Sequence, residues 1–245
     1  MEGATSMLLR RQLRVVLHQI QSAENLGAVA RVLANFDLRV LRLSDSRLND
    51  IDAAHRTAVH AEHVLAAAER MSRLGDAVAD AVYVLGTSGR DALRGRNPVS
   101  PEEGVERLRA AALRGPVALV LGGERRGLSD EELALCQDVA CIPAPGPQPS
   151  LNVAQAAAVL LYLASRADEA PPPAVIPDPG APQALREVLR RRMERALRAA
   201  DGLNPQSPLP VLDEMLRALD RAQLSRREAE LWAAVESGGP RLLVR

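Results

Sequence analysis

Short apolar runs alternate with helical patterns through residues 13–168, and this alternation restricts the chain to one class of fold. The apolar runs lie at residues 13–20, 38–43, 81–85, 117–121 and 139–142. Several of them are continuously apolar, as is typical of strands that are buried on both faces. Because a helix between two strands returns the chain to the start of the next parallel strand, the pattern predicts an α/β domain with a mostly parallel sheet.

The helices expected between these runs are indicated by the spacing of their apolar residues. Such residues recur at helical spacing in two places, at Leu26, Val29, Ala30 and Leu33, and again at Val105, Leu108 and Ala112. Ser129, followed by three acidic residues, is typical of a helix start. Residues 151–166 are apolar on nearly all sides, so we expect this last helix to be buried or to lie at a contact between subunits.

A proline-rich segment divides the chain. Six of the twelve residues from 171 to 182 are proline, which prevents regular helix and favours an extended linker. We therefore expect an α/β domain over residues 1–168, a linker over 169–183 and a small all-helical extension over 184–245. The extension carries six arginines and two glutamates between residues 186 and 198. This basic stripe is either a solvated helix face or a surface for nucleic-acid phosphates, with Arg190 and Arg191 as candidate contacts.

Composition excludes several classes of protein. All 31 basic residues are arginine, because the chain contains no lysine. P-loop enzymes, kinases and Schiff-base enzymes each need a lysine, so these functions do not fit. His60 and His63 have no third ligand near them in sequence, and no metal site is expected. Since no apolar stretch approaches the roughly 20 residues of a membrane span and no secretory signal is evident, we expect a cytoplasmic protein that does not contact a membrane.

Three loops that follow predicted strands contain residues that a bare scaffold does not need. The first contains Asn25, Gly27 and Arg31; taken alone, these are a helix cap, a point of close chain approach and a surface charge. The second reads GGERRGL at residues 122–128, which suits a phosphate site but lacks the spacing of a dinucleotide fold. The third reads IPAPGPQPSLN at residues 142–152, where Ser150 alone is a helix cap. Ligands of open α/β sheets bind at the carboxyl ends of strands, so these loops form the candidate site.

In this order and spacing, the three loops resemble the three motifs of the SPOUT superfamily of RNA methyltransferases, within its TrmH or SpoU branch of 2′-O-ribose methylases. The matching segments read ENLGAVARVLANFDL from residue 24, VLGTSGR from 84, PVALVLGGERRGLSDEELALC from 116 and PSLNVAQAAAVLLY from 149. Within that branch the likeness is strongest to TrmJ-type tRNA methyltransferases. Residues 202–235 also resemble the helical extension of that type.

The resemblance implies a knotted fold and a cofactor. The C-terminal part of the parallel sheet would be tied in a trefoil knot, an exception to the rule that chains do not thread loops. Enzymes of this branch are homodimers, and the apolar face of residues 151–162 would be part of the subunit contact. S-adenosylmethionine would be held in the knot, largely by main-chain groups of Thr87, Ser88, Gly89, Leu121, Gly122, Glu124, Ile142 and Leu151.

The reaction implied is S-adenosylmethionine-dependent methylation of a ribose 2′-hydroxyl of tRNA, at the first nucleotide of the anticodon loop, a cytidine or uridine at position 32. Arg31 corresponds to the catalytic arginine, while Asn25, Ser150 and Asn152 shape the site and Arg125 contacts RNA. Because a guanidinium stays protonated in proteins, we assign Arg31 to a flanking phosphate and to the developing 2′-oxyanion rather than to proton removal.

Two features depart from the family pattern. Residues 144–149 read APGPQP, where members tend to have Asn-Pro and an aromatic residue before paired serines, and His60 stands where members often carry glycine. Two other functions stay open: methylation of ribosomal RNA, which the helical extension disfavours, and RNA binding without catalysis.

Overall fold

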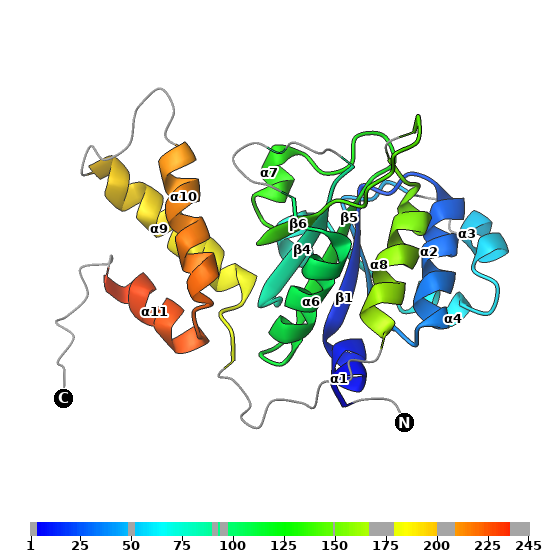
Figure 1. The fold of residues 1–245 in the computed structure, drawn as a ribbon, viewed down its shortest axis with the longest axis horizontal. Helices are drawn as coiled ribbons and strands as arrows, with labels where there is room; N and C mark the ends of the chain where they lie inside the picture. Colours follow the sequence, from blue (N-terminus) through cyan, green and yellow to red (C-terminus); the bar gives the residue numbers. More distant parts are fainter. Residues whose placement is uncertain are drawn as a thin grey trace.

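Six parallel strands form the centre of the computed structural model, which describes residues 4–48, 52–89, 93, 98–148, 150–166, 179–199 and 209–235. Every neighbouring pair in the sheet is parallel, so the α/β prediction is confirmed. The order is β3-β2-β1-β5-β4-β6 (Figure 1). The strands are β1 (Leu13–His18), β2 (Leu41–Ser44), β3 (Glu69–Met71), β4 (Tyr83–Thr87), β5 (Val117–Gly122) and β6 (Asp138–Ala140).

Helices cover both faces of the sheet. One face carries α1 (Ala4–Gln12), α2 (Ala23–Asn35), α6 (Pro101–Ala112) and α8 (Val153–Ser165), with α3 (Asp52–Thr57) and α4 (Glu62–Ala66) packed outside α2 (Figure 1). The other face carries the short helices α5 (Leu74–Ala77) and α7 (Asp130–Leu133). None of the helices in the described part of the chain combines the length and the apolar character needed to cross a bilayer.

The central strand β1 shows how the sequence builds these two layers. Successive side chains of a strand point to opposite faces. Val15 and Leu17 therefore pack in the core beneath α2, α6 and α8, whereas Val16 packs in the core on the other face. All three side chains are completely buried, which explains why this run contains no polar alternation.

Gly27 permits close packing of α2 on α3. A Cβ atom built on Gly27 would lie 2.1 Å from the carbonyl oxygen of Ala54 and 2.1 Å from the hydroxyl of Thr57. Such distances are far shorter than van der Waals contact. The expectation that Gly27 allows another segment to approach closely is confirmed.

Strand ends differ from those predicted. β1 stops at His18 because Gln19 takes a left-handed conformation with φ 54°. β2 begins at Leu41 rather than at residue 38, because the backbone N–H of Leu38 donates to the Leu33 carbonyl at 2.9 Å and so completes the end of α2. The short strand β3 was not predicted. Glu69 and Arg70 are charged and exposed, and only Met71 is half-buried, so no apolar run marks this strand.

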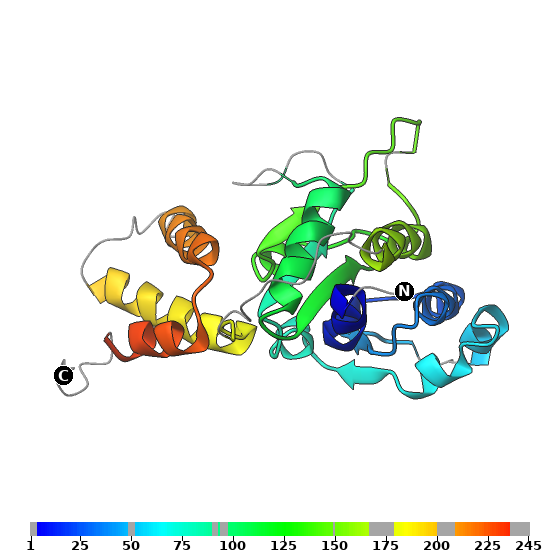
Figure 2. The same ribbon diagram turned by 60° about the horizontal axis from the view of Figure 1, so that its bottom comes forward.

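The extension consists of α9 (Gln183–Ala199), α10 (Leu209–Ala222) and α11 (Arg226–Val235) and stands beside the domain on the side away from α2 (Figures 1 and 2). Backbone hydrogen bonds attach it: the N–H of Gln183 donates to Ala81 at 2.8 Å, and that of Ala184 to Ala79 at 3.0 Å. Its own core is small and includes Leu189 and Ala229. Most of the linker predicted over 169–183 lies outside the described residues.

Candidate active site

The three loops singled out in the sequence meet at the carboxyl edge of the sheet. One side chain from each takes part in a continuous chain of hydrogen bonds. The Asn25 amide donates to Glu124 Oε1 at 3.0 Å, and the Asn152 amide donates to Asn25 Oδ1 at 2.9 Å. Residues separated by more than 120 positions are thereby held together in one site.

Glu124 fixes the start of α2. Its Oε2 accepts from the backbone N–H of Gln21 and its Oε1 from that of Ser22, both at 3.0 Å. Burial raises the pKa of Glu124, but hydrogen bonds from the Asn25 side chain and from backbone N–H groups outweigh this effect, so its pKa lies below the ordinary value. Glu124 is therefore an ionised acceptor, which suits two N–H groups that precede the first turn of α2.

Ser129 caps α7 as expected from sequence, but the caps of α2 and α8 are not the residues proposed. Ser22 caps α2 by accepting from the N–H of Asn25, which lies inside the first turn. Asn152 caps α8 and forms a reciprocal capping box with Gln155. The interpretations of Asn25 and Ser150 as caps are therefore wrong, and neither side chain is used to cap a helix.

A cavity of about 300 Å³ lies among the loops. Residues of the β4 and β5 loops and of the third loop line it, and its walls combine apolar side chains with a few polar and charged ones. A cavity of this size and mixed lining suits a compact organic ligand. Its lining includes all eight residues named from sequence as cofactor contacts: Thr87, Ser88, Gly89, Leu121, Gly122, Glu124, Ile142 and Leu151.

The glycines of the second loop shape one wall of the cavity. The N–H of Gly127 donates to the Gly123 carbonyl at 2.9 Å, and Gly127 has φ +65°. A Cβ on Gly122 would lie 2.3 Å from the Gly127 carbonyl carbon. The turn therefore depends on glycine at both ends, which leaves backbone groups next to the cavity.

The other predicted site residues are divided between this cavity and more distant positions. Ser150 and Arg125 line the cavity, and both are exposed. Arg31 is exposed on α2 and is not part of the cavity wall. Arg190 and Arg191 lie on α9 in the extension, apart from the three loops (Figure 1).

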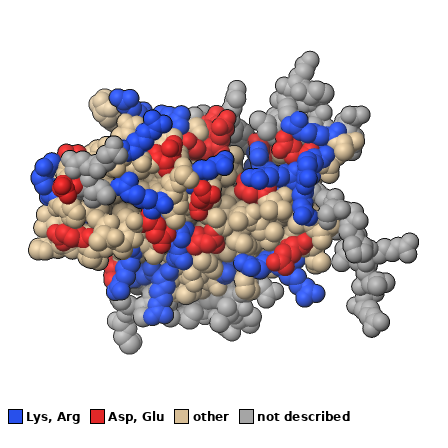
Figure 3. Space-filling view, turned by 180° about the vertical axis from the view of Figure 1, so that it is seen from behind, with Lys and Arg blue, Asp and Glu red and all other residues tan. Residues whose placement is uncertain are grey.

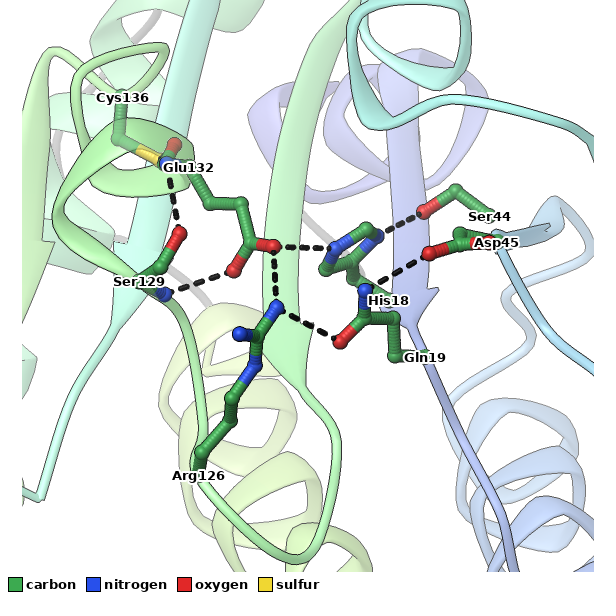
Figure 4. A network of polar contacts seen from close by, with 8 residues as sticks. All are labelled: His18, Gln19, Ser44, Asp45, Arg126, Ser129, Glu132 and Cys136. Carbon is green, nitrogen blue, oxygen red and sulfur yellow. Dashed lines mark hydrogen bonds and ion pairs between the residues drawn. The ribbon is translucent and has the colours of Figure 1, made fainter.

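A buried histidine, which the sequence did not single out, joins the end of β2 to α7 beneath the site. His18 is 4% exposed. Its Nδ1 lies 2.9 Å from the Ser44 hydroxyl, and its Nε2 lies 2.9 Å from Glu132 Oε1 in α7 (Figure 4). Since a carboxylate can only accept, Nε2 donates to Glu132, and in the neutral imidazole Nδ1 then accepts from Ser44.

Glu132 connects this histidine with the cavity wall. It accepts from the backbone N–H of Ser129 at 2.7 Å and from Arg126 Nη2 at 3.1 Å (Figure 4). Burial raises the pKa of Glu132, but the hydrogen bonds from Ser129 and His18 outweigh it and the pKa is lowered. The guanidinium of Arg126 also donates to Gln19 at 3.1 Å. These two hydrogen bonds, to Glu132 and to Gln19, fix the orientation of Arg126, which lines the cavity.

Sequence reasoning also missed several wall residues, among them Gly123, Arg126, Gly127 and Leu128. Their signal was present, since all four belong to the GGERRGL segment. His18 had no such signal, because a single histidine ending an apolar run resembles an ordinary core residue. Among the described residues, no group of three or more His, Cys, Asp or Glu is placed to hold a metal ion.

The comparisons with known proteins agree with this geometry. The SpoU rRNA Methylase family matches residues 12–162. The tRNA (cytidine/uridine-2′-O-)-methyltransferase TrmJ of Cronobacter sakazakii is 30% identical over 225 residues, which is 89% of this chain and 92% of that protein. The tRNA (cytidine-2′-O-)-methyltransferase TrmJ of Methanocaldococcus jannaschii is 31% identical over 60% of this chain, which spans 65% of that relative. The crystal structure of TrmJ from Zymomonas mobilis ZM4 superimposes with a TM-score of 0.77 at 26% identity, over 91% of this chain and 97% of that one.

Proposed function

Because the chain belongs to the SpoU methylase family, we propose that it methylates a ribose 2′-hydroxyl of tRNA with S-adenosylmethionine as methyl donor. The observation that carries the proposal is the extent of the likeness. The family match ends at residue 162, whereas the alignment with the Cronobacter enzyme covers 89% of the chain. It therefore reaches into the helical extension, which a likeness of the catalytic domain alone would not do.

The cavity at the carboxyl edge of the sheet fits the cofactor. Apolar side chains such as Leu121, Ile142 and Leu151 offer surfaces for an adenine ring, and Thr87 and Ser88 add polar groups beside them. When bound, S-adenosylmethionine supplies an electrophilic methyl group. The eight contact residues named from sequence would hold it, chiefly through main-chain groups.

The chain's own residues then have separable roles. Because a guanidinium group only donates hydrogen bonds, Arg31 acts as a donor to a flanking phosphate and to the developing 2′-oxyanion, a contribution of about 3 to 4 kcal/mol by analogy with other oxyanion donors. Its exposed position on α2 leaves it open to RNA. Asn25 and Asn152 fix the three loops relative to one another through their hydrogen bonds. Ser150 and Arg125 stand at the cavity, where Arg125 would contact RNA.

We further infer a homodimer whose contact includes α8. Helix α8 leaves Val159 37% and Tyr162 56% exposed, and Leu151 just before it is 38% exposed. Large apolar side chains close together on one surface favour a subunit contact. The trefoil knot remains a prediction of the family resemblance, whereas the division at residues 169–183 and a cytoplasmic location remain predictions from the sequence itself.

The nucleotide proposed as target is cytidine or uridine at position 32, the first of the anticodon loop. The names of the relatives support the two bases. The third loop, which differs from the family pattern at residues 144–149, lies next to Ser150 at the cavity, so a change of target would originate there.

Transfer of labelled methyl from S-adenosylmethionine to total tRNA, followed by mapping of the modified nucleotide, tests the proposal. Label on a 2′-oxygen of the anticodon loop is expected. Arg31→Ala should abolish transfer while calorimetric cofactor binding persists. Arg39→Ala is the matched control, because Arg39 is 80% exposed and precedes β2 at the opposite edge of the sheet.

Two other outcomes would replace the proposal. Label confined to ribosomal RNA supplied in parallel would keep the chemistry and change the substrate. Absence of label from both RNAs would make the chain an RNA-binding protein without catalysis.

A further inference from the structure

A second and larger cavity, of about 460 Å³, lies between the α/β domain and the extension. Its walls come from α6, from the start of β4, from β6 and from the three helices of the extension. We call it the interdomain cleft. Its lining includes five arginines and two aspartates and no other ionisable carboxylate. The arginines are Arg107, Arg114, Arg186, Arg217 and Arg221.

Both aspartates of the interdomain cleft are already engaged. Asp138 accepts from Arg107 at 2.7 Å and from the Tyr83 hydroxyl at 2.8 Å. Asp220 pairs with Arg186. The lining therefore offers no further acid to balance the remaining arginines, and the cleft keeps a positive excess.

Two of these arginines are open to a ligand. Arg217 and Arg221 lie on α10 with no hydrogen bond or ion pair to any residue that the structure describes. They are four positions apart, one helical turn of about 6 Å, and so reach the cleft from the same helix face. Arg217 is half-buried and Arg221 is exposed, and two guanidinium groups at this spacing suit successive phosphates better than a single carboxylate.

Positive charge also crowds the deeper part of the interdomain cleft. Burial and the neighbouring guanidinium of Arg114 lower the pKa of Arg186 to about 10. A nearby anion would offset this repulsion between cations. Apolar residues such as Val82 and Leu216 complete the lining, so a bound anion would be partly shielded from water.

The position of the cleft indicates an extended ligand. It lies at Val82 and Tyr83, at the start of β4, whereas the cofactor cavity lies at Thr87, where β4 ends. Four residues of strand separate these points by about 13 Å. Seen from behind, arginine side chains interleaved with acidic ones cover the extension, at the right of Figure 3.

We infer that the interdomain cleft binds phosphodiester groups of the RNA substrate at a distance from the ribose that is modified. The inference rests on the proposed function and adds a location for the tRNA backbone. It also changes the role of the basic stripe on α9. Arg186 is committed to Asp220, Arg192 donates to the Ala233 carbonyl, and Arg198 pairs with Glu194 at 2.7 Å, so much of that stripe serves the extension itself.

The test measures binding of an unmodified tRNA transcript by the full chain at several salt concentrations. The variant is Arg217→Gln with Arg221→Gln, and the matched control is Arg226→Gln with Arg227→Gln, two exposed residues of α11 outside the cleft. Each phosphate contact contributes about 0.7 to 0.9 to the slope of log affinity against log salt. The cleft variant should lose about 1.4 to 1.8 of that slope and the control none.

Two further measurements keep the test decisive. Cofactor affinity should be unchanged in the cleft variant, and Arg217→Lys with Arg221→Lys should restore most of the slope because the charge is retained. If the glutamine variant had the same salt slope as the wild type, the inference would be overturned. Methyl transfer to tRNA by the wild type would still leave the proposed function intact. Loss of slope only in Arg190→Gln with Arg191→Gln would move the contact to α9 and also overturn it.

Inorganic phosphate and pyrophosphate separate RNA from small anions. Suppose that phosphate or pyrophosphate bound the wild type but not the cleft variant, and that both proteins had the same salt slope for tRNA binding. The interdomain cleft would then be a small-anion site and the inference would be wrong. A wild-type protein that neither bound nor methylated tRNA would remove the proposed function and this inference with it.

Discussion

At the scale of single residues, Glu124 connects the fold with the site. Its two oxygens accept three hydrogen bonds, two from backbone N–H groups and one from Asn25. Glu124→Gln keeps the shape but places an NH₂ group opposite one of these donors. We expect a loss of about 1 kcal/mol in the free energy of unfolding, the usual net contribution of a hydrogen bond, measured by urea denaturation at pH 7.

The same substitution has a pH signature. Because the pKa of Glu124 is lower in the folded protein than its ordinary value of 4.5, its ionised form stabilises the fold fully above pH 4.5. This stabilisation disappears as the pH falls through the lower, folded-state pKa. The difference in unfolding free energy between wild type and Glu124→Gln should therefore shrink below pH 4.5. Glu131→Gln, in an exposed position of α7, is the control, and a difference that grew in acid would contradict the assignment.

His60 gives a second prediction at this scale. It has φ 64°, a left-handed conformation that costs most residues about 1–2 kcal/mol and costs glycine almost nothing. This conformation accounts for the glycine that the family resemblance implies at this position. After allowing for the greater chain entropy of glycine, His60→Gly should raise the unfolding free energy by about 0.5–1 kcal/mol. His63→Gly, inside α4, should instead lower it, and equal effects would show that backbone conformation is not the cause.

The sequence predicted the residues that line the cofactor cavity better than it predicted which residues cap α2 and α8. The eight proposed cofactor contacts carry the family motifs and line one cavity. Ser22 and Asn152 cap the helices in place of Asn25 and Ser150, because the position of a helix start depends on where tertiary bonds such as that of Ser22 N–H to Glu124 hold the chain. Several residues near each start have capping side chains, and sequence alone does not rank them.

At the scale of elements, α8 can separate a capping role from a role in the site. Asn152→Asp keeps an oxygen that caps α8 but cannot donate to Asn25, whereas Asn152→Ala loses both bonds. We expect the alanine variant to lose about 1 kcal/mol of stability and the aspartate variant to retain it. Both should transfer methyl roughly fivefold more slowly, which corresponds to the loss of one hydrogen bond of about 1 kcal/mol. Thermal melts and initial rates measure the two effects, and wild-type transfer by Asn152→Asp would show that the bond to Asn25 does not matter.

Elements were predicted where burial leaves a pattern. Each of the five apolar runs overlaps a strand of the sheet, because strands packed between two helix layers must be apolar on both faces. The edge strand β3 is covered less, and its segment Glu69–Met71 has no such requirement. Its pairing with β2 depends on distant residues, so no local signal identifies it.

At the scale of the whole molecule, the two cavities could not be predicted to the same degree. The cofactor cavity is made by loops that follow strands, and parallel topology alone places those loops at one edge. The interdomain cleft joins residues between 82 and 229. Its existence depends on how the extension attaches, through bonds such as that of Arg114 Nη2 to the Gln223 carbonyl at 2.7 Å, and no pattern in the sequence specifies this contact.

The proposed dimer gives a prediction at the same scale. Val159 and Tyr162 are exposed on a helix that is otherwise among the most apolar of the chain, so a partner that covers them would bury apolar surface. Val159→Arg with Tyr162→Arg places two charges there, and desolvating them would oppose association. Because both side chains already face solvent in the single chain, the variant should fold, elute as a monomer in light-scattering chromatography and lose transfer. Val59→Arg, at an equally exposed apolar position near α3, should remain dimeric. A double variant that stays dimeric would place the subunit contact elsewhere on the surface.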